Sequence, residues 1–129
     1  MPGAELIQVS GKEILYIDYS GCKPAEMLRI FDQAKEILLT MRGDGLLLTN
    51  FGHSYITPLF MRHAEKEILT VGHLIKKNSL IGMTLPQQMI LKGFRFFIGK
   101  DHYSHFDTRE QAIEYLISPV PVSATQRLR

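Results

Sequence analysis

The segment "GLLLTNFGHSYITPLF", residues 45–60, decides the fold because a strand signal and a helix signal follow each other within it. Its first part, "GLLLTNF", is a nearly continuous apolar run of strand length, which is typical of a central strand buried on both faces. Thr57 and Pro58 then predict the start of a helix, because threonine is a good N-cap and proline is tolerated at the first helical position. A short polar loop, residues 52–56, separates the two elements.

The residues before this segment predict a hairpin followed by a helix. The runs "ELIQVSG" and "EILYIDYSG" are rich in β-branched or aromatic residues, and the glycine-containing break between them favours an antiparallel hairpin. The stretch "CKPAEMLRIFDQAKEILLTMRGDG", residues 22–45, repeats apolar residues at spacings of three and four, which predicts an amphipathic helix. Pro24 suits its first turn, and we expect Gly43 to end it after Arg42.

The residues after the segment alternate helices and strands. The helix that follows the central strand carries an apolar stripe as far as Ile75, and "SLIGMTL", residues 79–85, predicts a strand after the polar break "KKN". Pro86 opens a third helix with Met89 and Phe94 on its inner face. "HYSHFD" predicts a short strand and "TREQAIEYLI" a capped last helix. The order β-β-α-β-α-β-α-β-α predicts an α/β fold with a single mixed, mostly parallel sheet, amphipathic helices and an antiparallel N-terminal edge.

The composition is that of an ordinary globular domain. The 129 residues carry 15 basic and 13 acidic side chains, and the net charge of +2 gives no field strong enough to favour nucleic acid as a partner. Cys22 is the single cysteine and has no partner for an internal disulfide. No window approaches the roughly 20 continuous apolar residues of a membrane span, and the N-terminus has no signal-peptide pattern. We expect a cytoplasmic domain over residues 1–118, with a flexible tail over residues 119–129.

The C-terminal third, residues 79–117, resembles the SpoIIAA-like family of the STAS/SEC14-type fold, and the resemblance extends over residues 5–117. The shared pattern is a strand with a small residue, a helix ending in aromatics and Gly-Lys, a strand ending in Phe-Asp-Thr, and a helix with an alanine and an aromatic. Its positions here are Gly82, Phe94 to Phe97, Gly99, Lys100, Phe106, Asp107, Thr108, Ala112 and Tyr115. The resemblance implies a mixed sheet with amphipathic helices and no particular reaction. Relatives include antagonist proteins that act by protein binding and serine phosphorylation, and lipid-binding domains of related architecture.

The resemblance also points to a possible switch. In the regulatory STAS proteins a phosphorylatable serine lies at the start of the helix after the central strand, the region that Ser54 and Thr57 occupy here. A phosphate at a helix N-terminus is favoured by free backbone N–H groups and the helix dipole. However, Asn50 and His53 replace the acidic context of those proteins, and no Ser-Gly pair follows. The alternative is that Thr57 is a plain N-cap, whose replacement by Ala costs roughly 1 kcal/mol.

The same loop suggests an enzyme only weakly. His53 and Ser54, with Asp18 or Asp107 at another strand end, supply the residue types of a base, a nucleophile and an orienting acid. The stretch "GHSYI" has the first glycine of the Gly-x-Ser-x-Gly elbow but not the second, and adjacent His and Ser side chains do not easily point at each other. An enzyme of unknown type centred on His53, Ser54 and Tyr55 is therefore the third hypothesis.

Metal and nucleic acid are not expected ligands. The five histidines and one cysteine show no ligand spacing, so we predict no metal site and no cofactor. The stretch "LKGFRFFIGK" mixes basic and aromatic residues, as single-strand nucleic-acid sites do. On a helix its phenylalanines would share an inner face while its basic residues turn outward, which is the pattern of a core helix.

The leading hypothesis is a non-enzymatic, cytoplasmic regulatory or protein-interaction module that binds a partner protein or itself as a homodimer. The alternative is a carrier or sensor of a small apolar ligand or lipid, in a pocket at the C-terminal ends of the parallel strands. Met and Phe side chains make adaptable apolar clefts. The residues predicted for the ligand or partner surface are His53, Tyr55, Phe60, Met61, Met89 and Phe94.

Overall fold

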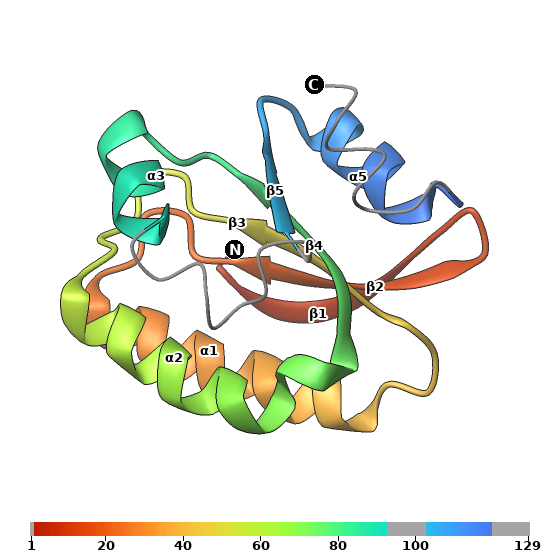
Figure 1. The fold of residues 1–129 in the computed structure, drawn as a ribbon, viewed down its shortest axis with the longest axis horizontal. Helices are drawn as coiled ribbons and strands as arrows, with labels where there is room; N and C mark the ends of the chain where they lie inside the picture. The colour runs from red at the N-terminus through yellow and green to blue at the C-terminus, as the bar shows by residue number, and fades with distance from the viewer. Residues whose placement is uncertain (1, 93–102, 120–129) are drawn as a thin grey trace.

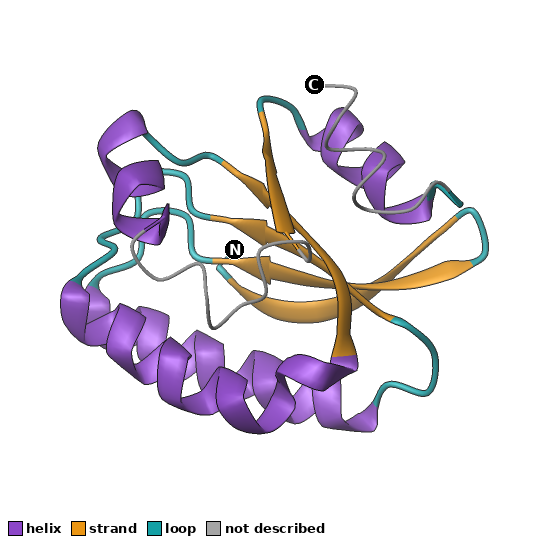
Figure 2. Cartoon of the chain, in the orientation of Figure 1, coloured by secondary structure: helices purple, strands orange, loops and turns teal. Residues whose placement is uncertain are grey.

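A computed structural model describes residues 2–92 and 103–119, which form a five-stranded sheet with helices on both faces (Figures 1 and 2). The elements are β1 (Gly3–Val9), β2 (Lys12–Asp18), α1 (Pro24–Thr40), β3 (Gly45–Asn50), α2 (Pro58–Val71), the 3-10 turn η1 (Gly72–Leu74), β4 (Ile75–Ile81), α3 (Leu85–Lys92), β5 (Tyr103–Phe106) and α5 (Arg109–Ile117). Apart from η1, this is the predicted order.

The sheet has the strand order β1-β2-β3-β4-β5. β1 pairs with β2 in antiparallel fashion, and the β2–β3, β3–β4 and β4–β5 pairs are parallel. The predicted N-terminal hairpin and mostly parallel sheet are therefore confirmed. Each parallel pair is joined through a helical segment, as parallel strands require.

The strand β3 is buried on both faces, as its apolar run predicted. Leu46, Leu47, Leu48 and Thr49 are each at most 5% exposed. Leu47 belongs to the core beneath α1 and α2, whereas Leu46 and Leu48 belong to the core beneath α5. Figure 1 shows this arrangement, with α1 and α2 side by side below the sheet and α5 on its other side.

The strand β4 begins at Ile75, four residues before the predicted start, and α2 ends earlier, at Val71. The polar "KKN" was wrongly interpreted as a break, because Lys77 points into the protein and is only 4% exposed. Its ammonium donates to the carbonyl oxygens of Tyr115 at 3.0 Å and Ser118 at 2.7 Å, at the C-terminal end of α5. Burial lowers the pKa of Lys77, and the positive charges of neighbouring lysines lower it further.

Two helices also differ from their predicted limits. α1 ends at Thr40 rather than Arg42. α3 begins at Leu85, because Thr84 and Gln87 cap it reciprocally through backbone-to-side-chain hydrogen bonds of 3.0 and 3.3 Å. Met89 is 72% exposed, so its predicted place on an inner helix face is wrong.

Some predictions fall on other parts of the chain. Phe94, Gly99 and Lys100 lie outside the described residues, as do residues 120–129 of the predicted tail. The domain limits therefore stay predictions. Within residues 2–92 and 103–119, none of the helices combines the length and apolarity needed to cross a membrane.

The buried ammonium of Lys77 leads to a prediction about stability. Lys77→Met removes two hydrogen bonds from a charged donor and keeps a long apolar side chain, so we expect the free energy of unfolding to fall by about 1–3 kcal/mol. Chemical denaturation measures this change. The control is Lys76→Met, because Lys76 is exposed and pairs with the exposed Asp44, and such a pair contributes less than about 1 kcal/mol. Equal stability of the Lys77→Met protein and the wild type would contradict the proposed role.

Candidate functional site

A cavity of about 100 Å³ lies between the α1–α2 layer and the sheet. Its walls come from β2, β3, β4, α1 and α2, and they are mostly aliphatic and aromatic. Representative wall residues are Leu15, Leu47 and Leu80 from the sheet and Phe60, Met61 and Ile68 from α2. Polar side chains are few among the lining residues: Tyr19, Lys35, Thr49 and Asn78.

The volume of the cavity limits what it holds. An apolar cavity of about 150 Å³ stays dry and binds benzene, whereas sites for drug-sized ligands measure about 300–1,000 Å³. At about 100 Å³ the space suits one compact ring or a short branched group rather than a long acyl chain. The sequence suggested a carrier of either a small apolar ligand or a lipid. The volume of the cavity favours the small ligand over the lipid.

Packed aromatic rings form one end of the cavity. Tyr19 stacks on Phe51 with ring centroids 5.1 Å apart, and Phe60 meets both rings nearly at right angles, at 5.4 and 6.5 Å. Phe31 on α1 packs edge-on against Phe60 at 6.0 Å. Burial, with a smaller contribution from Asp32, raises the pKa of Tyr19, so its hydroxyl stays protonated. Such ring pairs hold this wall in a fixed geometry.

The predicted ligand surface is divided between the cavity and the exterior. Phe60 and Met61 line the cavity, whereas His53, Tyr55 and Met89 are exposed on the surface. Phe94 lies outside the described residues. The predicted residues therefore do not form a single site.

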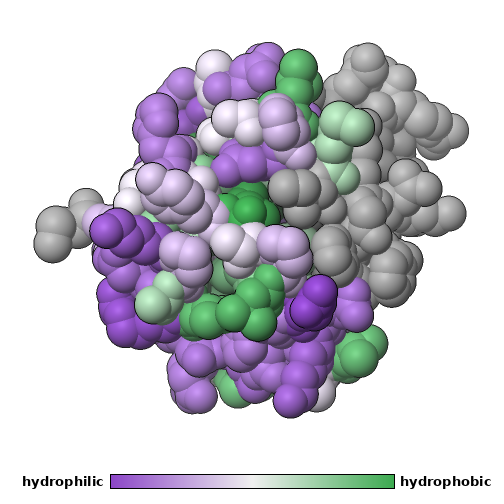
Figure 3. Space-filling model, turned by 90° about the vertical axis from the view of Figure 1, so that its left-hand side faces the viewer, coloured by the Kyte–Doolittle hydropathy of each residue, from purple (hydrophilic) through white to green (hydrophobic). Residues whose placement is uncertain are grey.

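The exposed part belongs to an apolar surface that we call the edge patch. It consists of Tyr55, Leu59, Leu85 and Met89, which are 58%, 62%, 75% and 72% exposed. These residues come from the loop after β3, the start of α2, and α3, all at the edge where the parallel strands end (Figure 1). Figure 3 views the molecule from this side, and hydrophobic residues gather near the centre of the face, where the surface is hollowed.

The loop between β3 and α2 is held by its own hydrogen bonds. The Ser54 hydroxyl donates to the Phe51 carbonyl at 2.7 Å, and Ser54 is only 7% exposed. Gln87 of α3 donates to the Ser54 carbonyl at 3.0 Å and ties the loop to that helix. His53 has a positive φ of 55° and an exposed side chain. In the described part of the chain no hydrogen bond joins His53 to Ser54, and Asp18 accepts from the nearby Ser20 backbone N–H.

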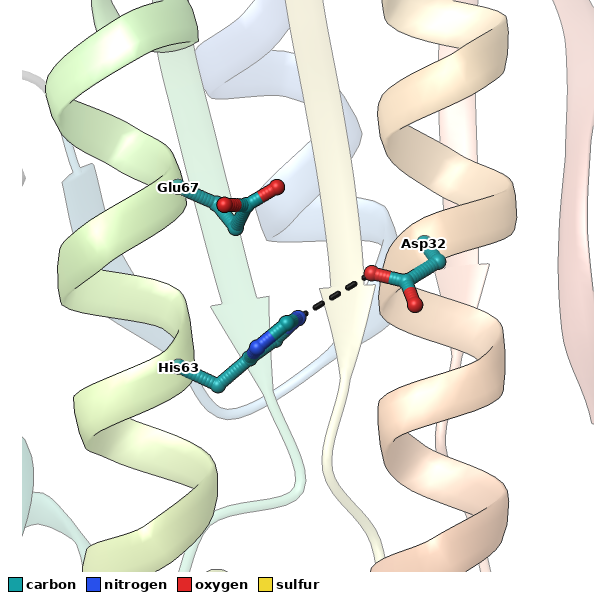
Figure 4. Close-up of side chains that lie close together, drawn as sticks. All are labelled: Asp32, His63 and Glu67. Atoms are coloured by element: carbon teal, nitrogen blue, oxygen red, sulfur yellow. Dashed lines mark hydrogen bonds and ion pairs between the residues drawn. The ribbon is translucent and has the colours of Figure 1, made fainter.

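Charged side chains connect α1 and α2 beside the cavity. Lys35 forms an ion pair with Glu67. His63 Nε2 lies 3.0 Å from an Asp32 carboxylate oxygen, and Figure 4 shows this pair joining α2 to α1. Lys35 also lines the cavity, and Phe31 packs edge-on against the His63 ring at 5.3 Å. These pairs hold together the two helices that form the outer wall of the cavity.

The same cluster contains a set of metal-ligand types that the sequence did not predict. The ligand atoms of Asp32, His63 and Glu67 all lie within 4.8 Å of one another. The one available signal was the spacing of His63 and Glu67, one helical turn apart on α2, because Asp32 comes from another helix. Glu67 is engaged by Lys35, whose ammonium repels a cation. We therefore interpret the cluster as interhelical pairing.

Comparison with known proteins supports the fold. No protein-family model matches the chain, and no curated protein matches its sequence. One similar solved structure is that of an uncharacterized protein from the DUF3478 family with a SpoIIAA-like fold, from Shewanella loihica PV-4, with a TM-score of 0.68. The match covers 88% of this chain and 92% of that chain, at 13% sequence identity. This chain has a SpoIIAA-like fold. At that identity the similarity shows the fold alone.

Residues that suggested the resemblance have structural roles in the SpoIIAA-like fold. Gly82 has φ +80°, and a Cβ atom there would lie 2.6 Å from the Gly52 nitrogen, so the close approach of β4 to the loop requires glycine. Phe106 packs against Tyr115 with ring centroids 5.1 Å apart. Thr108 caps α5 by accepting from the Gln111 N–H at 3.1 Å, as predicted.

The predicted switch residues, Ser54 and Thr57, lie between β3 and α2. Thr57 accepts from the Phe60 N–H at 3.1 Å, which confirms the predicted N-cap. Ser54 precedes the same helix, but a phosphate on its buried hydroxyl requires the loop to open, because the hydroxyl is engaged by the Phe51 carbonyl. Phosphorylation of Ser54 or Thr57 stays a prediction.

The ion pair between α1 and α2 predicts an acid-sensitive contribution to stability. The hydrogen bond from Lys35 lowers the pKa of Glu67 below its ordinary value of 4.5. Because the folded state has the lower pKa, this contribution is present at neutral pH and is lost as the pH falls through the lowered value. We expect Glu67→Gln to be less stable than the wild type at pH 7 and the difference to shrink in acid, as measured by thermal denaturation at a series of pH values. Glu65→Gln on the same helix is the control, and a pH-independent difference for Glu67→Gln would contradict the role of the pair.

Proposed function

We propose that this chain is a non-enzymatic module that binds a compact apolar molecule in the cavity between the α1–α2 layer and the sheet. The cavity is the observation that supports this proposal. The Ser54 hydroxyl, which an enzyme at the loop would need, is engaged by a backbone carbonyl of its own loop. The proposal includes a cytoplasmic location, for which the buried, unpaired thiol of Cys22 is suitable.

The apolar wall favours an apolar ligand. A compact apolar molecule in the cavity would contact the aliphatic and aromatic lining and would leave less of its own surface in water. The stacked aromatic rings and the Lys35–Glu67 pair hold the walls in place, so little conformational entropy is lost on binding.

A second candidate function is binding of a partner protein or of a second copy of the chain through the edge patch. The exposure of the four edge-patch residues favours it, because exposed apolar side chains gathered from neighbouring elements are typical of interaction surfaces. Binding of a partner protein or of a second copy is also the leading hypothesis from the sequence. It does not compete with the cavity for residues, since none of the four lines the cavity.

The proposed ligand site is tested with toluene, a small apolar probe. A ligand at about 100 times its Kd stabilises a protein by about 2.7 kcal/mol, so we expect toluene to raise the melting temperature of the wild type. Ala64→Leu adds an isopropyl group inside the cavity, and we expect this variant to lose the toluene response while it keeps its stability. Ala34→Leu fills the same cavity from α1 and serves as a second test.

The matched control is Ala25→Leu, an exposed position on α1, which should keep the toluene response. Absence of any toluene effect on the wild type, in melting temperature and in NMR spectra, would contradict the proposed function. An unchanged toluene response in folded Ala64→Leu and Ala34→Leu proteins would show that toluene binds outside the cavity, which would contradict the proposed site.

Self-association through the edge patch is tested by sedimentation. If a second copy binds there, we expect concentration-dependent dimerisation of the wild type, and loss of it when Leu85 and Met89 are both replaced by Glu, because a buried carboxylate is costly. The control replaces Leu39 and Leu69, which are exposed elsewhere, by Glu. A dimer that survives the Leu85 and Met89 replacements would show that another surface forms the contact.

A further inference from the structure

The polar side chains in the cavity wall differ in whether another protein group already pairs with them. Lys35 pairs with Glu67, so its charge is compensated. The Thr49 hydroxyl donates to the Asn78 side-chain oxygen at 3.0 Å. Two groups remain available among the residues that the structure describes: the amide N–H groups of Asn78 and the hydroxyl of Tyr19.

The Asn78 side chain faces the cavity because of the alternation along β4. Its neighbours Lys77 and Ser79 point to the other face of the sheet, where they bond to carbonyl oxygens of α5. Asn78 and Leu80 therefore face the α1–α2 layer, and both line the cavity. The neighbour of Asn78 on β3 is Leu47, another lining residue, so the amide lies beside apolar side chains of the sheet, with Thr49 as its polar partner.

The hydrogen bond from Thr49 determines which end of the Asn78 side-chain amide can bind a ligand. Thr49 is 4% exposed and occupies the amide oxygen of Asn78, so the NH₂ end is left as the donor. A purely hydrocarbon ligand would leave these N–H groups without an acceptor after excluding water, which is unfavourable. A charged ligand would lose its hydration, and the nearby ammonium of Lys35 is already neutralised by Glu67.

We propose that the cavity selects compact apolar molecules that carry one uncharged oxygen, which accepts a hydrogen bond from the Asn78 amide. This inference rests on the proposed function and names its ligand class. Small phenols, alcohols and ketones belong to the class. Thr49 is a positioning residue that holds the amide with its NH₂ end toward the ligand.

Toluene and phenol are a matched pair of probes, because a hydroxyl in phenol replaces the methyl group of toluene at nearly the same size. We expect the wild type to bind phenol at least as tightly as toluene, by NMR titration, although phenol must lose more hydration. Asn78→Leu should weaken phenol binding about tenfold or more, the effect of one lost hydrogen bond to a buried donor, and should not weaken toluene binding, because the variant no longer has N–H groups that toluene leaves without an acceptor. Asn78→Ala should show the same loss of phenol preference and replaces the first variant if it does not fold.

The controls separate this inference from the proposed function. Thr40→Val removes an exposed hydroxyl on α1 and should change neither affinity. Toluene binding with an unchanged phenol-to-toluene ratio in both Asn78 variants would overturn the inference and leave the proposed function standing. Loss of phenol binding in Tyr19→Phe, with full binding in the Asn78 variants, would likewise overturn the assignment to Asn78. If neither probe binds the wild type, the proposed function itself fails.

Discussion

The burial of strand β3 on both faces is the constraint on which the rest of the structure depends. Leu46 to Thr49 are all nearly inaccessible, so helices must cover the sheet above and below this strand. β3 also pairs in parallel with β2 and β4, which requires connections that cross over one face. α1 and α2 supply these connections and cover that face. The other face is left for α5, which follows the last strand.

Both faces are covered by apolar packing, but they differ in the polar interactions that accompany it. α5 is a short helix that β4 holds through polar bonds: Lys77 and Ser79 donate to the carbonyls of Tyr115, Ser118 and Ala112. α1 and α2 are longer helices that meet the sheet with apolar side chains and meet each other through ion pairs. The cavity lies on their side of the sheet. Two helices crossing three strands leave space where the side chains between them are too short to meet, as at Ala34 and Ala64.

The sequence was sufficient to predict features that depend on neighbours along the chain. The caps at Thr57 and Thr108 and the buried run in β3 each have a local physical cause. The start of β4 was wrongly predicted because burial of Lys77 depends on carbonyl acceptors that follow it by 38 and 41 residues. A lysine in a sequence gives no sign of such distant partners.

The candidate site could be predicted only in part for the same reason. Phe60 and Met61, two residues of the predicted surface, line the cavity, which extends along the strands rather than lying only at their C-terminal ends. The cavity depends on how far side chains from three strands and two helices extend into the space between them. No local sequence pattern shows how much of that space they fill together. The pairs between α1 and α2 likewise require the two helices to lie side by side, which the periodicity of either helix does not reveal.

The loop between β3 and α2 connects the two proposed functions physically. Phe51 precedes its turn and Phe60 follows its N-cap, and both line the cavity. Between them the loop exposes Tyr55 to solvent and buries Ser54 through a bond to Phe51 itself. The Ser54–Phe51 bond is thus a direct link between the loop and one residue of the cavity wall. If binding at the loop changes the affinity of the cavity for its ligand, reciprocity requires the ligand to change the affinity of the loop by the same factor.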